Sequence, residues 1–258
     1  MAVIGNLTRD VVDGGPPRVG GAPYHAARAL RLLGGRARVL ARCAEADRRA
    51  LLPALVALGV PVHWRASLTT ASFSLRYEGE DRTLELDDPG TPWTVDDAAA
   101  VDRVEWLQVG GLTRGDFTPA VLASLARDHR LALDGQALVR PARTGRLVLD
   151  AEFDPAVLRH LTALKLAQEE VEALGGEEAA EALGVPELLL TYGSRGAVLV
   201  TAGRRERIPV RRIDTSNPTG AGDAFLAGYA WARAAGHRPV SAARTAGSIA
   251  SRVLELDA

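Results

Sequence analysis

Apolar and polar positions follow two different periods along the chain. Apolar runs typical of buried strands alternate with segments in which apolar residues recur every three or four positions, as in amphipathic helices. The helical period predicts helices over residues 24–33, 48–58, 118–129, 169–174, 177–183, 224–235 and 240–254. Strands and helices that alternate from end to end predict an α/β fold, with a mainly parallel sheet covered by helices.

One region departs from this alternation. Between residues 72 and 86 apolar side chains occupy every second position on either side of the polar turn 78–81. They are Phe73, Leu75, Tyr77, Leu84 and Leu86. A period of two predicts two strands that form an antiparallel hairpin. The pattern leaves two roles open for this hairpin, either a lid over a site or an extension of the sheet edge.

Length and composition limit the kind of protein. A chain of 258 residues with 47% hydrophobic content is ordinary for one α/β domain, so a single domain over 1–258 is expected. A net charge of -1 provides no basic field for nucleic acid. Cys43 is the single cysteine, and no apolar run reaches the roughly 18 residues that span a bilayer. We therefore expect a cytoplasmic protein with neither nucleic acid nor a membrane as partner.

The clearest chemical signal lies in residues 217–225, where a polar turn leads directly into a helix. Gly220 and Gly222 open that helix, and amides of a first helical turn have no intrahelical acceptor, so an anion can approach them. Asp223 would repel a phosphate there unless it acted as a general base beside it. The alternative is that Asp223 is a favourable acid in the first turn and the glycines only shape a bend. Both interpretations are open for the motif taken alone.

Other phosphate-binding motifs fit less well. The chain has no G-x-x-x-x-G-K-[ST] segment, and the pair Gly220 and Gly222 lacks the third glycine and the preceding strand of a dinucleotide fingerprint. The sequence therefore does not favour a P-loop enzyme or a Rossmann dehydrogenase.

Residues 219–225 resemble the C-terminal signature of the ribokinase-like, or PfkB, family of carbohydrate kinases. Upstream, residues 190–197 resemble the strand-turn-strand segment that contacts the nucleotide in this family. Residues 5–10 and 20–22 resemble its sugar-binding strand end and double glycine. The resemblance implies a ribokinase-like three-layer sandwich with a mainly parallel central sheet and a small β lid, formed from about 7–19 and 67–90.

The resemblance also implies an activity, the ATP-dependent phosphorylation of a hydroxyl on a small polyol, either a sugar or a cyclitol. Asp223 would be the catalytic base, and Mg²⁺ would bridge the nucleotide phosphates. By the same resemblance, the phosphoryl group lies at Gly220, Ala221 and Gly222, the acceptor at Asp10, Gly20 and Gly21, and the nucleotide at Thr191, Gly193 and Thr219.

Some positions depart from the family pattern. Ala167 stands where an asparagine of the metal-phosphate motif is expected, which leaves Glu170 to order Mg²⁺ through water. Asn217 stands where the family usually has an aspartate, with Asp214 and Thr215 just upstream, and this puts a monovalent-cation site in doubt. Thr8 lies where the ribose-binding motif has a second asparagine, which disfavours ribose itself.

Several alternatives stay open. The short front segment and compact lid resemble the inositol-kinase-like branch. A nucleoside kinase is also open, because Phe73 or Tyr77 could stack on a base. Ala167 also keeps open a non-catalytic ligand-binding relative. The family often pairs through its lid strands, so a homodimer is a further alternative.

Overall fold

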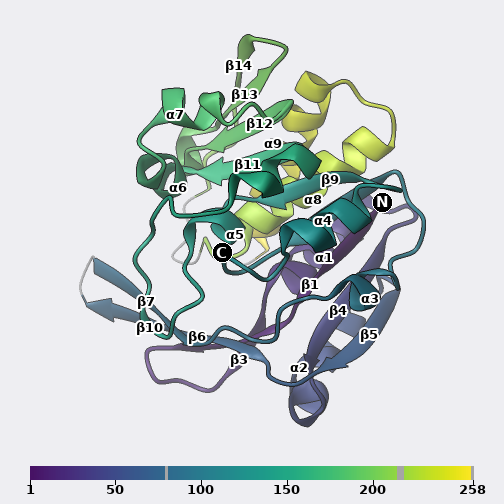
Figure 1. Cartoon of the computed structure of the whole chain (residues 1–258), viewed down its shortest axis with the longest axis vertical. Coiled ribbons are helices and arrows are strands. Elements are labelled where there is room, and N and C mark those ends of the chain that lie inside the picture. Colours follow the sequence, from purple (N-terminus) through teal and green to yellow (C-terminus); the bar gives the residue numbers. More distant parts are fainter. Residues whose placement is uncertain (79–80, 214–217, 257–258) are drawn as a thin grey trace.

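The computed structural model describes residues 1–78, 81–213 and 218–256 of the chain (Figure 1). Its larger sheet has the strand order β14-β13-β12-β11-β9-β8-β1-β4-β5. In chain order these strands are β1 (Ala2–Asn6), β4 (Arg38–Ala44), β5 (Val62–Ser67), β8 (Trp106–Gly110), β9 (Arg130–Asp134), β11 (Leu161–Ala167), β12 (Glu187–Thr191), β13 (Ala197–Thr201) and β14 (Arg204–Ile208). Every neighbouring pair from β5 to β12 is parallel, and β13 and β14 continue the sheet antiparallel. The predicted mainly parallel sheet is thereby confirmed.

Helices cover both faces of this sheet. One face packs against α1 (Ala22–Leu33), α8 (Ala221–Ala234) and α9 (Pro239–Glu255). The other packs against α3 (Val95–Ala98), α4 (Pro119–Leu125), α5 (Gln136–Val139), α6 (Gln168–Ala173) and α7 (Glu177–Ala182). Helix α2 (Arg48–Val56) and the short 3₁₀ turns Glu45–Asp47, Pro155–His160 and Gly193–Arg195 complete the described helical elements. The larger sheet with helices on both faces is therefore the three-layer α/β sandwich that the sequence predicts.

Local sequence explains most helix ends. Helix α4 begins after Thr118, whose hydroxyl accepts the Val121 amide, with proline at its first position. It ends at Leu125, four residues before the predicted end, because the chain turns there to enter β9 and His129 Nδ1 contacts the Val104 carbonyl at 2.7 Å. None of the helices in the described ranges is long and apolar enough to cross a membrane.

A second, smaller sheet has the order β10-β7-β6-β2-β3 and is called the lid sheet below. Its strands are β2 (Thr8–Val12), β3 (Arg18–Gly20), β6 (Ala71–Glu78), β7 (Asp81–Asp88) and β10 (Gly145–Arg146). The predicted antiparallel hairpin is β6 and β7, and it belongs to this sheet and not to an edge of the larger one (Figure 1). Turn residues 79–80 lie outside the described residues. Strand β10 comes from a part of the chain that the sequence did not associate with the lid.

Parallel pairing brings the carboxyl ends of β1, β8, β9 and β11 to one edge of the larger sheet. The chain leaves β1 there to enter β2 of the lid sheet, and α8 begins at the same edge. Ligands of open α/β sheets bind outside the carboxyl ends of the strands. The fold thus places a site between this edge and the lid sheet.

Candidate active site

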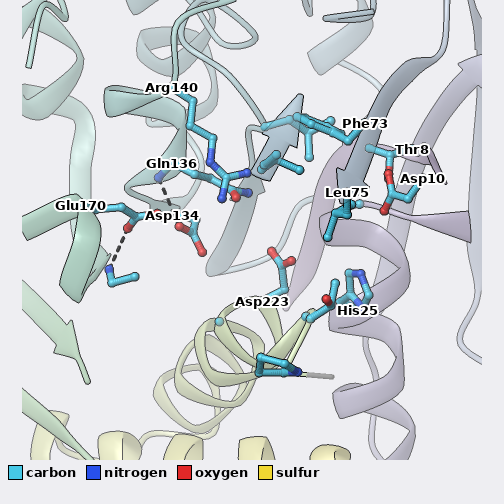
Figure 2. Close-up of a pocket in the computed structure, with 18 of the residues that line it drawn as sticks. Thr8, Asp10, His25, Phe73, Leu75, Asp134, Gln136, Arg140, Glu170 and Asp223 are labelled. Carbon is cyan, nitrogen blue, oxygen red and sulfur yellow. Dashed lines mark hydrogen bonds between the residues drawn. The ribbon is translucent and has the colours of Figure 1, made fainter. Parts of the chain in front are cut away.

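A cleft of about 210 Å³ lies between the lid sheet and the edge where the parallel strands end (Figure 2). Both sheets contribute to its walls, together with α1, α6, α8 and the turn around α5. Its polar lining comprises Thr8, Asp10, His25, Asp134, Gln136, Arg140, Lys165, Glu169, Glu170, Thr219 and Asp223, and its apolar lining includes Phe73, Leu75, Leu84 and Leu112. The cleft therefore unites segments that are more than 200 positions apart in the sequence.

Asp223 lies on the floor of the cleft, in the first turn of α8 (Figure 2). Its Oδ1 atom is buried and has no hydrogen-bond partner among the described residues. Burial, with repulsion from Asp134, raises the pKa of Asp223 to about 7, although Lys165 opposes the shift. A carboxylate with a pKa near neutrality and an unsatisfied oxygen can accept a proton from a bound hydroxyl.

The start of α8 has the geometry of an anion site. Gly220 adopts the left-handed conformation with φ of 83°, and the helix begins at Ala221, three residues earlier than the apolar pattern predicts. The Ala221 amide donates to the Pro218 carbonyl at 3.2 Å. The amide of Gly222 lies in the first turn, where amides have no intrahelical acceptor. Gly220 and Gly222 line the cleft, whereas Ala221 does not.

Asp10 and Thr8 project from β2 on the opposite side of the cleft (Figure 2). Burial raises the pKa of Asp10 to about 6, although the Thr8 hydroxyl opposes the shift, and Asp10 Oδ1 has no hydrogen-bond partner among the described residues. Gly20 lies beneath these side chains, because a β-carbon there would overlap the Asp10 carboxylate. Gly21 lines the cleft with φ of 88°. Unsatisfied buried oxygens of this kind indicate a polar ligand.

A buried ion-pair cluster forms the wall near the end of β11, and the sequence did not identify it. Lys165 and Asp134 are direct partners in the register of β11 and β9. Lys165 Nζ lies 2.9 and 3.0 Å from the two Asp134 oxygens and 3.6 Å from Glu170 Oε2. Burial alone lowers the pKa of Lys165, but Asp134 and Glu170 outweigh it and raise that pKa, so the ammonium stays charged.

Arg140 provides a second cation, immediately after α5. Figure 2 shows its side chain reaching toward the cleft from above Gln136 and Asp134. Its Nε atom is buried without a hydrogen-bond partner among the described residues. Gln136 is held by its own bond to the Gly111 carbonyl at 3.0 Å. An arginine fork with an unused donor is suited to a phosphate or carboxylate group.

Not every residue predicted at the site lines the cleft. Of the described residues expected at the nucleotide, Thr219 lines it, while Thr191 and Gly193 do not. The Thr191 hydroxyl instead donates to the Leu166 carbonyl at 3.2 Å. Asn217, Asp214 and Thr215 lie outside the described residues. His25, which the family resemblance did not place at the site, lines the cleft from α1.

The residues of the cleft offer Mg²⁺ little direct coordination. Within residues 1–78, 81–213 and 218–256, no three His, Cys, Asp or Glu side chains are grouped to hold a metal ion. Glu170 Oε2 accepts the Ala167 amide at 2.7 Å and lies beside the Lys165 ammonium. Asp134 is likewise paired with Lys165. With its carboxylate engaged in this way, Glu170 would reach a metal only through water, and this role stays a prediction.

Solved structures of kinases share this fold. A pyrophosphate-dependent kinase of the ribokinase family, complexed with a pyrophosphate analogue and myo-inositol, is 25% identical, with a TM-score of 0.86 over 98% of this chain and 94% of the other. A pyrophosphate-dependent myo-inositol-1 kinase converted into a myo-inositol-3 kinase by two substitutions to leucine is 24% identical, with a TM-score of 0.85 over 98% and 92%. The nucleoside kinase of Burkholderia thailandensis in complex with inosine is 22% identical, with a TM-score of 0.74 over 97% and 89%.

The family model for the pfkB family of carbohydrate kinases matches residues 17–256, which include strands β3, β6, β7 and β10 of the lid sheet, the buried cluster and the start of α8. This match and the kinase fold support a phosphotransferase that acts on a sugar or polyol hydroxyl. The chain belongs to the PfkB family of carbohydrate kinases.

Proposed function

We propose that this kinase phosphorylates a hydroxyl of a small cyclic polyol, with Asp223 as the general base. The observation that supports this most directly is that two half-buried carboxyl groups face one cleft, each with a buried oxygen that has no hydrogen-bond partner among the described residues. Asp10 is on the lid side and Asp223 is at the helix start. One carboxylate can hold the acceptor while the other takes its proton.

The acceptor would lie between a polar wall and an apolar wall of the cleft. Asp10 and Thr8 offer oxygens to its hydroxyls, whereas Phe73, Leu75 and Leu84 offer an apolar surface to a ring's C–H face. The relative complexed with myo-inositol supports a cyclitol.

The transfer step uses groups of this chain. As the acceptor oxygen forms its bond to phosphorus, its proton passes to the Asp223 carboxylate. The bond between phosphorus and the bridging oxygen breaks, and its electron pair leaves with the departing phosphate or nucleotide. Amides at the start of α8, with Gly222 as the cleft-lining residue, would stabilise charge on the transferring group. The lid sheet would exclude water, which competes as an acceptor.

ATP is the donor that the family implies, and Thr219, which lines the cleft, would lie beside its terminal phosphates. Mg²⁺ would be held mainly by the donor phosphates and through water by Glu170, and it would neutralise phosphate charge. Every protein-derived role above is independent of whether the donor carries a nucleoside.

Inorganic pyrophosphate is the second candidate donor, and two observations favour it. Thr191 and Gly193, the residues expected at a nucleotide, do not line the cleft, whereas Arg140 and Lys165 do. A donor without a nucleoside must be held by its phosphates alone, and a buried ammonium with a half-buried guanidinium suits that task. The relative complexed with a pyrophosphate analogue agrees with this donor.

A matched screen tests these proposals. Purified protein is incubated with Mg²⁺ and either ATP or pyrophosphate against cyclitols, hexoses, pentoses and nucleosides, and products are identified by phosphorus NMR and mass spectrometry. A phosphorylated cyclitol, absent with Asp223→Asn, is the expected result. Phosphorylation of nucleosides alone would show that the acceptor is a nucleoside and not a cyclitol. Binding of an acceptor without any product would favour a non-catalytic ligand-binding protein.

A further inference from the structure

Lys165 is unique in this chain. Of the 31 lysine and arginine residues in the sequence, only Lys165 is a lysine. At exposed positions lysine and arginine can replace each other at little cost in stability. A sequence that strongly prefers arginine can therefore lose its surface lysines easily. A buried position that needs a compact ammonium with rotatable donors does not accept the planar arginine fork. The retained lysine therefore marks a position with a specific chemical demand.

The position of Lys165 in the cleft indicates where this chemical requirement arises. Lys165 is 4% exposed and lines the cleft near the end of β11. A β-carbon at Gly222 would lie 3.2 Å from Lys165 Nζ, so the missing side chain at Gly222 leaves the ammonium directly against the first turn of α8. The same turn carries Asp223. The single lysine, the helix amides and the candidate base thus meet at one corner.

A purely structural role does not account for this arrangement. Burying an ion pair gains little stability compared with apolar residues of the same size, because desolvation offsets the attraction. An ammonium has three N–H donors. Within the described residues Lys165 Nζ donates hydrogen bonds to Asp134, and Glu170 at 3.6 Å is an ion-pair neighbour only. At least one N–H remains for a ligand in the cleft.

We propose that Lys165 is a further catalytic residue, which donates this N–H to a nonbridging oxygen of the phosphoryl group during transfer. The inference rests on the proposed function and deepens it. Asp134 and Glu170 keep the ammonium charged and aimed, so the charge is in place before the donor arrives. Lys165 neither gains nor loses a proton in the step. Asp223 receives the hydroxyl proton, and the leaving oxygen receives the electron pair of the broken bond.

The single lysine allows a direct test without turnover. Protein grown with isotope-labelled lysine gives one side-chain NMR signal, which is recorded during titration with methylene diphosphonate, with a nonhydrolysable ATP analogue, and with myo-inositol alone. We expect a saturable shift with at least one phosphate compound and a much smaller one with myo-inositol. An unmoved signal, while calorimetry shows that a phosphate compound binds, would overturn the proposal.

Variants of Lys165 provide a second test, based on turnover. Lys165→Met and Lys165→Arg should each lower kcat by about 100-fold or more, as expected for loss of a transition-state donor, with the acceptor KM nearly unchanged. Arg127→Met, which removes an exposed cation, is the control with wild-type activity. Thermal unfolding of each variant identifies those that fail to fold. Near-normal kcat in folded Lys165→Met overturns the proposal.

The two proposals fail in different ways. If the wild-type protein forms no product with any donor while the lysine signal still responds to phosphate compounds, the proposed kinase function fails and the phosphate contact of Lys165 is supported. The other case is an active wild-type kinase in which the lysine signal does not respond to phosphate compounds and kcat is unchanged in the Lys165 variants. Only the inference about Lys165 then fails.

Discussion

Gly220 and His25 pack so closely that a β-carbon at position 220 would overlap Nδ1 of the His25 imidazole. Gly220 also has φ of 83°, in the left-handed region that side chains other than glycine rarely adopt. Two independent constraints, one local and one from α1, therefore require glycine where α8 begins. This contact places the start of α8 directly against α1.

Gly220→Ala should accordingly lower both stability and activity. We expect a loss of about 1–3 kcal/mol in the free energy of unfolding, measured with urea, and a large fall in kcat. Gly203→Ala is the control, because Gly203 has φ of 69° but no atom within 4 Å of its added β-carbon. The control bears the backbone cost alone and should keep its activity. Equal activity of both variants would contradict the role of this contact.

Asp223→Asn removes the candidate base while preserving size. We expect kcat to fall by about 10²- to 10⁴-fold, the range for loss of a general base, with binding of acceptor and donor retained by calorimetry. Asp128→Asn, at an exposed position, is the matched control. Turnover of Asp223→Asn close to wild type would rule out this base.

The raised pKa of Asp223 predicts opposite pH trends for activity and stability. Activity needs the ionised carboxylate, so kcat should rise with pH through about 7. The folded state keeps the proton between the ordinary value of 3.8 and about 7, whereas the unfolded state has already released it. This group's contribution to stability therefore falls as pH rises across that window. Urea unfolding of wild type and Asp223→Asn should show that the variant lacks this decline.

Arg140→Met tests the donor side of the cleft. Loss of a charged fork that contacts a phosphate should raise the donor KM by about 10-fold or more, and more for pyrophosphate than for ATP. The acceptor KM should change little. Arg143→Met, three positions away and exposed, serves as control. A rise confined to the acceptor KM would place Arg140 at the acceptor instead.

The lid leucines are expected to select which hydroxyl reacts. Leu75 and Leu84 are cross-strand partners in β6 and β7, and both line the cleft. Leu75→Asn with Leu84→Ser would convert an apolar wall into a hydrogen-bonding one and turn the acceptor ring. We expect a changed ratio of phosphorylated isomers by phosphorus NMR, with the donor KM unaffected. Arg76→Asn, an exposed position of the same strand, should leave the isomer ratio unaltered.

Local features of this protein followed from the sequence because they depend on neighbouring residues. Alternation of apolar positions identified the hairpin of β6 and β7, and the glycine pair identified the start of α8 with Asp223. Asp10 and Gly21, predicted through the family resemblance, also line the cleft. The composition contained one more signal, the single lysine at position 165, which an analysis of periodicity and motif spacing does not detect.

The buried cluster depended on the tertiary structure. Lys165 and Asp134 are 31 positions apart and meet because β11 and β9 are neighbours in register, a pairing that sheet order decides. The same holds for Arg140, and for Thr191 and Gly193, which the fold leaves outside the cleft. Charge, burial and pKa depend on distances between segments that are remote along the chain. The sequence therefore determined which chemical groups this protein carries, and only the order of the strands decided which of them act together.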